Sequence, residues 1–332
     1  AVLVIAGACA GLYFAGDRVS EQLHLWLASS GGGDLAAVPQ PRTATPSADP
    51  SALTEMPALA TTAGVTPETW PDLSPADLLA QGAALGERSL KDTAFDQPPW
   101  RRFARPFTAP EGRPLLGLLV TGLGIDRAVT AAAIAGLPPD VSLSFDPKAP
   151  ELADWIAAAR AFGHEAMLDL PMQSKDGTDV GPQGLVIGLN DGEMARRIDA
   201  AAEAGPQSIG FAAAGGDALL LDDRATTAAL AEIARLGRGF IDTSGEPMSQ
   251  APVAADAAGL PFARSMVRLD EAASRTALTE RLAVLAQTAI AHGSALACAR
   301  ASPAAIVGIA DWARRQSDDG PVLAPASALM KP

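Results

Sequence analysis

The stretch LLGLLVTGLG, residues 115–124, decides the fold of the larger part of the chain. It is an apolar run with the length of a strand, and it ends in the polar Thr121 and the small Gly122. Runs of this kind predict buried β-strands. Further apolar, strand-like runs follow near residues 141–145, 164–170, 207–211, 238–242, 261–266, 294–299 and 321–324.

Helical patterns lie between these runs, and several have a recognisable start. Asn190 and Glu193 have capping-box spacing, while Ser302 and Pro303 combine a cap with a first-turn proline. Residues 271–292 supply a long amphipathic pattern. Alternation of strands and helices predicts an α/β fold with a parallel sheet covered by helices. Periodicity alone does not separate an open doubly wound sheet from a closed barrel.

The N-terminus predicts a membrane anchor over residues 1–28. Residues 1–16 carry no charge and would make a helix of roughly 24 Å, slightly shorter than a hydrocarbon core of about 30 Å. Val19, Leu23 and Trp26 then fall on one face at helical spacing, which predicts an interfacial ending. A cleavable signal peptide is the alternative, because residues 8–10 offer a small-x-small site.

Gly7 and Gly11 form a G-x-x-x-G pair within this predicted anchor. Such a pair allows a second helix to approach closely in lipid. The alternative interpretation is that small residues are frequent in membrane helices for no specific reason. We take the pair as the candidate packing face of the anchor.

Three further segments follow the anchor. Residues 29–67 are rich in Gly, Ala, Pro, Ser and Thr and cannot bury enough apolar surface to fold, which predicts a flexible linker. Residues 68–112 are expected to form a short helix, capped by Ser74 and Pro75, and an extended strap. Residues 113–332 form the predicted barrel domain.

Composition excludes one class of partner. Lys and Arg number 25 against 38 Asp and Glu, which gives a formal net charge of −13. An acidic chain has no electrostatic footprint for nucleic acid, so we expect no such partner. The two cysteines, Cys9 and Cys298, lie in the predicted anchor and in a predicted strand and say little about redox compartment.

From about residue 115 the chain resembles the divergent polysaccharide deacetylase family of bacterial envelope proteins. Thr121 and Gly122 stand where that family usually carries an Asp pair. Three other motifs of the family are altered in this chain, at residues 169–172 (Asp-Leu-Pro-Met), 213–217 (Ala-Ala-Gly-Gly-Asp) and 299–301 (Ala-Arg-Ala). The resemblance covers roughly residues 113–330 and implies an irregular (β/α) barrel of about seven strands.

The resemblance also implies a divalent metal, held by Asp and His, with a second Asp as base. Thr121 and Gly122 supply neither a carboxylate nor an imidazole. The three histidines are in the wrong places, because His24 belongs to the anchor and both His164 and His292 precede strands. We therefore predict no metal and no cofactor.

Polar residues remain at the expected mouth of the barrel, where function sits in such folds. The candidates are the residual carboxylates and two weaker substrate-binding residues: Asp146, Asp169, Asp217 and Asp242, with Arg300 and Thr121. The carboxylates can bind a hard cation, or two can act as acid and base in the manner of a glycosidase. They can equally cap helices, pair with Arg300 or remain solvated.

The degraded motifs favour a catalytically inactive, membrane-anchored protein that acts as an interaction or scaffold subunit of an envelope membrane complex. The resemblance implies an inner-membrane, single-pass protein whose barrel lies in the periplasm, with at least one protein partner. Two alternatives remain open. One is an active carbohydrate deacetylase or hydrolase that uses the residual Asp residues, and the other is a glycan-binding module.

Overall fold

The structure is a computed structural model that describes Trp70 and residues 72–85, 89–90, 96–269, 274–316 and 319–331. These residues belong to one compact unit, residues 56–332. Within them, no helix combines the length and the apolar character needed to cross a bilayer. The predicted anchor 1–28, with Gly7 and Gly11, and the predicted linker 29–67 lie outside the described residues.

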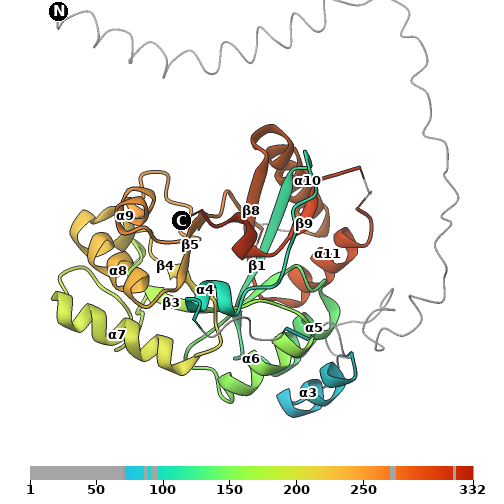
Figure 1. Ribbon diagram of the computed structural model, residues 1–332, viewed down its shortest axis with the longest axis horizontal. Coiled ribbons are helices and arrows are strands. Elements are labelled where there is room, and N and C mark those ends of the chain that lie inside the picture. The colour runs from blue at the N-terminus through green and yellow to red at the C-terminus, as the bar shows by residue number, and fades with distance from the viewer. Residues whose placement is uncertain are drawn as a thin grey trace, which may run out of the picture. The chain divides into compact units, whose positions relative to one another are not determined.

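The described residues alternate strands and helices from residue 115 onward, as expected (Figure 1). The strands are β1 (Leu115–Leu123), β2 (Ser142–Phe145), β3 (Ala166–Met172), β4 (Gly210–Gly215), β5 (Gly239–Asp242), β6 (Phe262–Arg264), β7 (Val267–Arg268), β8 (Ser294–Arg300) and β9 (Val322–Ala324). The helices are α3 (Pro75–Ala84), α4 (Pro99–Arg102), α5 (Arg127–Gly136), α6 (Leu152–Ala161), α7 (Asp191–Ala204), α8 (Asp223–Arg235), α9 (Ala251–Ala258), α10 (Arg275–His292) and α11 (Pro303–Ala313), with 3₁₀ turns η5 (Leu219–Leu221) and η6 (Ala326–Leu329).

The strands form one curled parallel sheet, a half-barrel with eight strands in the order β6-β5-β4-β3-β2-β1-β8-β7. β9 lies off this path and pairs with the start of β1. The α/β class and the parallel sheet are therefore confirmed, whereas the predicted closed form of about seven strands is only partly matched. The difference arises at residues 261–266. There, Ser265 N–H donates to the backbone carbonyl of Asp242 in β5, but Met266 N–H donates to the backbone carbonyl of Leu296 in β8. The chain changes neighbour between two consecutive residues, so one expected strand becomes β6 and β7.

Local capping explains where the helices begin. Ser74 and Asp77 form a complete capping box at the start of α3. The Asn190 side chain accepts a hydrogen bond from Glu193 N–H at 2.9 Å, and the Ser302 hydroxyl accepts one from Ala305 N–H at 3.2 Å. These caps satisfy N–H groups that a helix leaves without partners at its first turn.

Two layers of apolar side chains hold the sheet. One, the outer core, lies between the sheet and its helices and includes Leu118 and Phe240. The other, the inner core, fills the concave side of the sheet and includes Leu119, Met167 and Ile241. Because successive side chains of a strand point to opposite faces, membership of one core fixes the face of the neighbouring residue.

A buried carboxylate organises the base of the half-barrel, which is the end where the strands begin. Glu165 lies just before β3 and is fully buried. One of its oxygens, Oε1, accepts from Arg105 N–H at 2.9 Å and from the Ser327 hydroxyl. The other, Oε2, accepts from Ser327 N–H at 3.1 Å and the Ser142 hydroxyl at 3.2 Å. Glu165 therefore joins the strap, β2 and the C-terminal segment.

The strap and the C-terminal segment both cross this base. Figure 1 shows α4 and the red C-terminal segment on the face toward the viewer, over the beginnings of the strands. Phe103, which follows α4, packs in the inner core. The Arg105 guanidinium donates to Asp140 at 2.8 Å and to the Gly163 carbonyl at 2.9 Å. The strap is thus an integral part of the folded unit.

His164, next to Glu165, is enclosed at the same end. Its ring nitrogens lie 2.8 Å from the Val141 carbonyl oxygen and 3.0 Å from that of Ile134. Burial lowers the pKa of His164, which favours the neutral imidazole. His164 contacts two backbone segments at the base, and because it precedes β3 it lies at the opposite end of that strand from the mouth.

Candidate functional site

Asp169 is the central side chain of the mouth, the end where the strands finish. It lies on β3 two residues after Met167 and therefore points to the concave side of the sheet. Its side chain is buried, with a relative exposure of 6%. Oδ2 accepts from Gly122 N–H at 2.7 Å, and Oδ1 accepts from the Ser144 hydroxyl at 2.5 Å. Residues of three adjacent strands thus converge on one carboxyl group.

The environment of Asp169 makes it a titrating group near neutral pH. The pKa of Asp169 is raised from 3.8 to about 6, mainly by burial and to a smaller extent by the nearby charge of Asp146. The hydrogen bonds from Ser144 and Gly122 and the charge of Arg300 oppose this rise. A buried carboxyl with this pKa can hold or release a proton close to physiological pH.

Gly122 shapes the local backbone that meets Asp169. Its φ of 76° lies in the left-handed region, which glycine adopts without strain. This bend at the end of β1 aims the Gly122 N–H toward the Asp169 carboxylate. The position that carries a carboxylate in the resembling family therefore presents a backbone donor here.

Asp146 and Arg300 flank Asp169. Asp146 follows β2 directly, is half-buried, and its Oδ1 accepts from Lys148 N–H at 2.8 Å. Arg300 ends β8, is exposed, and pairs in register with Thr121 of β1. The Thr121 hydroxyl donates to the Ala299 carbonyl at 3.4 Å. The positive charge of Arg300 lies close enough to Asp169 to lower the pKa of that carboxyl.

Asp242 and Asp217 belong to a different network. Asp242 alternates with Ile241 of the inner core, so it lies on the outer face of the sheet, in register with Arg264 of β6. Its Oδ2 is 3.7 Å from Arg264 Nε, and its Oδ1 accepts from the Ser244 hydroxyl at 2.6 Å. Asp217 accepts from Lys175 N–H at 3.1 Å.

Two charged side chains connect these groups. Lys175 pairs with Glu246, and the Glu246 carbonyl accepts from the Arg264 guanidinium. The structure thus brings Asp146, Asp169, Arg300 and Thr121 together and places Asp217 and Asp242 in a separate ion network.

The donor set at the mouth does not fit the divalent metal that the resemblance implies. Among the residues that the structure describes, no three His, Cys, Asp or Glu side chains are placed so that they can hold one ion. Both Asp169 oxygens already accept hydrogen bonds from protein donors, and Asp146 turns an oxygen to its own loop. A hydrolytic metal needs several ligands that converge on one point.

Sequence reasoning missed Ser144, the hydroxyl partner of Asp169, and the network residues Lys175, Glu246 and Arg264. The signal for Ser144 was present, because Ser142 and Ser144 alternate with Leu143 and Phe145 in β2. Such alternation predicts a strand with one polar face. No comparable signal marked the other three, because their contacts join loops far apart in the sequence.

Comparison with known proteins agrees with the fold and with the motifs. Residues 118–330 match the family model described as divergent polysaccharide deacetylase. The crystal structure of uncharacterized protein ATU2773 from Agrobacterium tumefaciens C58 is similar, with a TM-score of 0.67 and 26% sequence identity. The match covers 71% of this chain and 97% of that chain. A search of curated proteins found no match.

Proposed function

Because the chain belongs to the divergent polysaccharide deacetylase family, yet its mouth does not fit a metal, we propose that it is a non-catalytic member. Its barrel acts as an interaction subunit of a bacterial envelope membrane complex. The N-terminal segment anchors it in the inner membrane, and the barrel lies in the periplasm. The anchor and the location rest on the sequence pattern and the family.

One observation carries the loss of catalysis. Asp169, the first residue of the altered family motif at residues 169–172, accepts hydrogen bonds from Gly122 N–H and from the Ser144 hydroxyl. Gly122, in the position of an expected carboxylate, is itself one of the two donors. The residues that would hold an ion therefore bind one another, and among the described residues no second and third ligand joins Asp169 to complete a metal site.

Acetate release tests the proposal. The purified full-length chain is incubated with an acetylated chitooligosaccharide and with zinc, manganese or cobalt, and both acetate and bound metal are measured. We expect no acetate above the protein-free control and no stoichiometric metal. Metal-dependent acetate release that is lost in Asp169→Ala, but kept in Asp217→Ala of the separate network, would show that this chain is an enzyme.

The anchor offers a second test of the interaction role. Gly7→Leu with Gly11→Leu adds bulk where close helix approach is needed, without shortening the apolar span. We expect the double variant to stay in the membrane fraction after carbonate washing and to co-purify less of a membrane partner. A protein that runs as an isolated monomer from mild detergent, both with and without these changes, argues against the interaction role.

A second function is favoured by the pKa of Asp169. A carboxyl with a pKa of about 6 is suited to proton donation, and Asp146 lies close enough to influence it electrostatically. The pair would then act on a glycan bound beside Arg300. Reducing-end release from a glycan substrate between pH 5 and 7, abolished by Asp169→Asn, would support hydrolysis over a purely binding role.

A further inference from the structure

The long helix α10 has two largely uncharged faces, and the described residues cover only one of them. Leu278, Leu282, Leu285 and Ala289 are buried, on the side where α10 packs against β8, β1 and α11. These positions are four, three and four residues apart, which is the spacing of one helix face. On the opposite side lie six exposed residues, which we call the outer face of α10: Glu280, Ala283, Val284, Gln287, Ile290 and Ala291.

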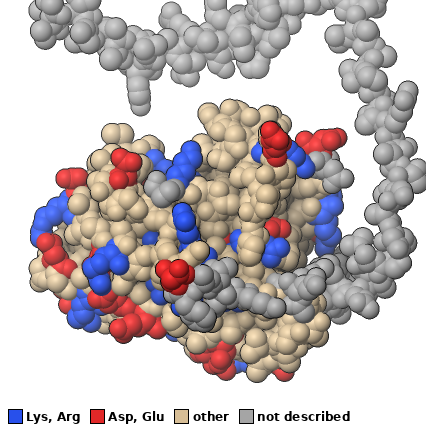
Figure 2. All heavy atoms as spheres, in the orientation of Figure 1, with Lys and Arg blue, Asp and Glu red and all other residues tan. Residues whose placement is uncertain are grey.

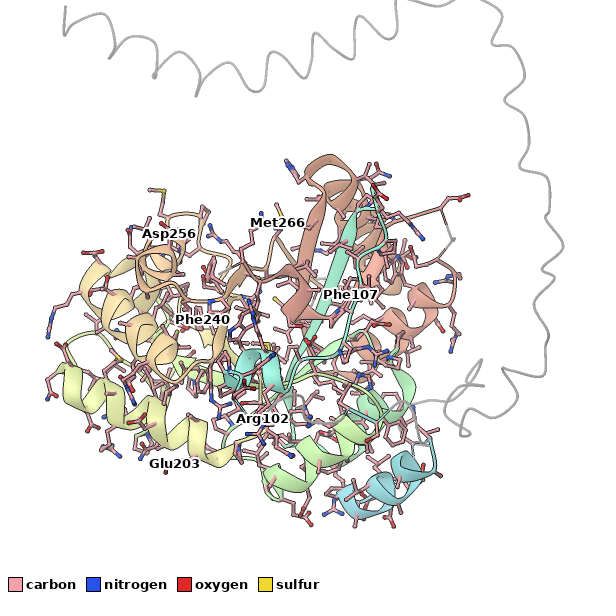
Figure 3. The ribbon with its side chains drawn as sticks, viewed as in Figure 1. Arg102, Phe107, Glu203, Phe240, Asp256 and Met266 are labelled. Carbon is pink, nitrogen blue, oxygen red and sulfur yellow. The ribbon has the colours of Figure 1, made fainter. Side chains whose placement is uncertain are left out.

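The outer face of α10 carries less charge than the exposed faces of other helices around the sheet. Val284 is 58% exposed, Ile290 is 53% exposed, and Glu280 is the one charged residue of the six. In contrast, Glu203 of α7 and Asp256 of α9, which are labelled in Figure 3, lie on the exposed faces of their helices. Figure 2 shows side chains of both charges gathered over the part of the molecule that carries α7 and α8. A helix that is apolar on both sides is expected to be covered on both sides.

The outer face is arranged symmetrically about Gln287. The large apolar residues Val284 and Ile290 stand three residues before and three residues after it, and the small Ala283 and Ala291 stand four before and four after. At about 100° per residue, the members of each pair lie on opposite sides of the midline of the face. A two-fold rotation about Gln287 therefore places Val284 of one copy on Ile290 of a second copy. The same rotation places Ala283 on Ala291, where two small side chains allow the helices to approach closely.

The polar groups of the outer face match one another under the same rotation. At its centre the two Gln287 amides face each other, and an amide both donates and accepts hydrogen bonds. Glu280 stands seven residues before the centre, while Ser294 stands seven residues after it and follows the exposed His292 closely. Each Glu280 carboxylate therefore meets a hydroxyl and an imidazole of the second copy, both of which can donate to it. Like charges do not meet along the pair.

We propose that α10 packs antiparallel against α10 of a second copy of this chain, about a two-fold axis at Gln287. A membrane surface is a poorer occupant, because helices that lie on a bilayer present Lys or Arg beside Trp, Phe or Leu, and the outer face has none of these. The net charge of −13 also opposes binding to anionic lipids. One helix pair buries less than the roughly 800 Å² per partner of a stable interface, so the dimer is weak and depends on concentration.

Single cysteines on the outer face test this register directly. In the full-length chain with Cys9→Ser, Gln287→Cys places two thiols at the axis, where the Cα atoms can come within the about 7 Å that a disulfide requires. Glu280→Cys is the matched exposed control, because its two copies lie roughly 21 Å apart along the helices. Cys298 is buried and is kept in both variants. We expect mild oxidation to give a disulfide-linked dimer with Gln287→Cys and none with Glu280→Cys.

Sedimentation of the full-length chain in mild detergent measures the strength of the pair. Gly7→Leu with Gly11→Leu forms the background, so that association through the N-terminal segment does not contribute. In this background, Val284→Glu with Ile290→Glu places carboxylates at both large contacts, and we expect the dissociation constant to rise at least about tenfold. Val253→Glu is the control, because Val253 is 69% exposed on α9, and it should leave the constant unchanged. Thermal melts confirm that each variant is folded.

Three results would overturn the proposal. They are the absence of a disulfide from Gln287→Cys, an equal yield from Glu280→Cys, and self-association that is indifferent to Val284→Glu with Ile290→Glu. A monomer whose outer face is nevertheless protected from hydrogen exchange would show that another part of the chain covers α10. None of these measurements involves acetate release or a membrane partner, so their failure leaves the proposed function standing.

Discussion

Two buried carboxylates on the same strand region, Glu165 at the base and Asp169 at the mouth, differ in the donors that surround them. Each Glu165 oxygen accepts from a backbone N–H, of Arg105 or Ser327, in addition to a hydroxyl. Asp169 has one backbone donor, Gly122, on one oxygen and only the rotatable Ser144 hydroxyl on the other. Burial raises the pKa of both groups.

These donors determine whether each carboxyl oxygen must accept a hydrogen bond or can also donate one. A backbone N–H cannot reverse its direction, so Glu165 must remain an acceptor at both oxygens. A hydroxyl can either donate or accept, so the Ser144 side of Asp169 tolerates a donor. The base therefore needs an acceptor at both carboxyl oxygens, whereas the mouth needs one only on the Gly122 side and tolerates a donor toward Ser144.

The largest effect is expected from Glu165→Gln. Either orientation of the new amide places its NH₂ group against the Arg105 or the Ser327 backbone N–H. An unsatisfied buried donor of this kind costs about 3 kcal/mol. We expect urea unfolding of the full-length chain to show this loss, together with faster proteolysis of the strap. A stability equal to wild type would show that Glu165 does not hold the base.

Asp169→Asn is the matched isosteric substitution, and we expect it to stabilise the protein at neutral pH, whereas Glu165→Gln destabilises it. Its amide oxygen can accept from Gly122 N–H while its NH₂ donates to Ser144, so both contacts survive. The folded-state pKa of Asp169 is raised from 3.8 to about 6, so its contribution to stability is complete below about pH 4. That contribution is lost as the pH rises through 6.

The variant should consequently gain about 2 kcal/mol over wild type at pH 7 and lose this advantage near pH 4. Urea midpoints measured between pH 4 and 7.5 report the difference. A variant that is destabilised equally at every pH would mean that the mouth is as rigidly matched as the base.

The smallest effect concerns Arg300. Its positive charge lowers the pKa of Asp169, so Arg300→Ala should raise that pKa further above about 6. Because Arg300 is exposed, salt should screen the attraction and reduce the difference between variant and wild type. Carboxyl carbon NMR titrations at low and high ionic strength measure this, with Arg300→Lys as the control that keeps the charge. Identical titrations would place Arg300 too far from Asp169 to matter.

Sequence patterns predicted the elements well because their causes are local. Each apolar run became a strand, and the caps Ser74, Asn190 and Ser302 start α3, α7 and α11. Capping depends on residues three apart, and burial of a strand depends on its own side chains. The family resemblance supplied what periodicity could not, namely the curled form of the sheet.

The sequence did not show that the candidate carboxylates fall into two separate groups, Asp146 with Asp169 and Asp217 with Asp242. Phe240 and Ile241 are both apolar, so the pattern of β5 does not show which face of the strand Asp242 shares. Strands of a parallel sheet are buried on both faces, which removes the alternation that would reveal it. Only the packing of Ile241 in the inner core shows that Asp242 lies on the opposite face of the sheet from Asp169.

The pairing of β1 affects how the chain folds as it is synthesised. Its neighbours β8 and β9 come late, and the contact of Thr121 with Ala299 joins residues that are 178 positions apart. During synthesis the apolar LLGLLV segment of β1 is made well before β8. Its edge toward β8 therefore stays unpaired until most of the chain has been made. Long-range closure of this kind slows folding and exposes aggregation-prone surface in the interval. Refolding of the full-length chain should therefore be slow, and its intermediates should aggregate more readily at higher protein concentration.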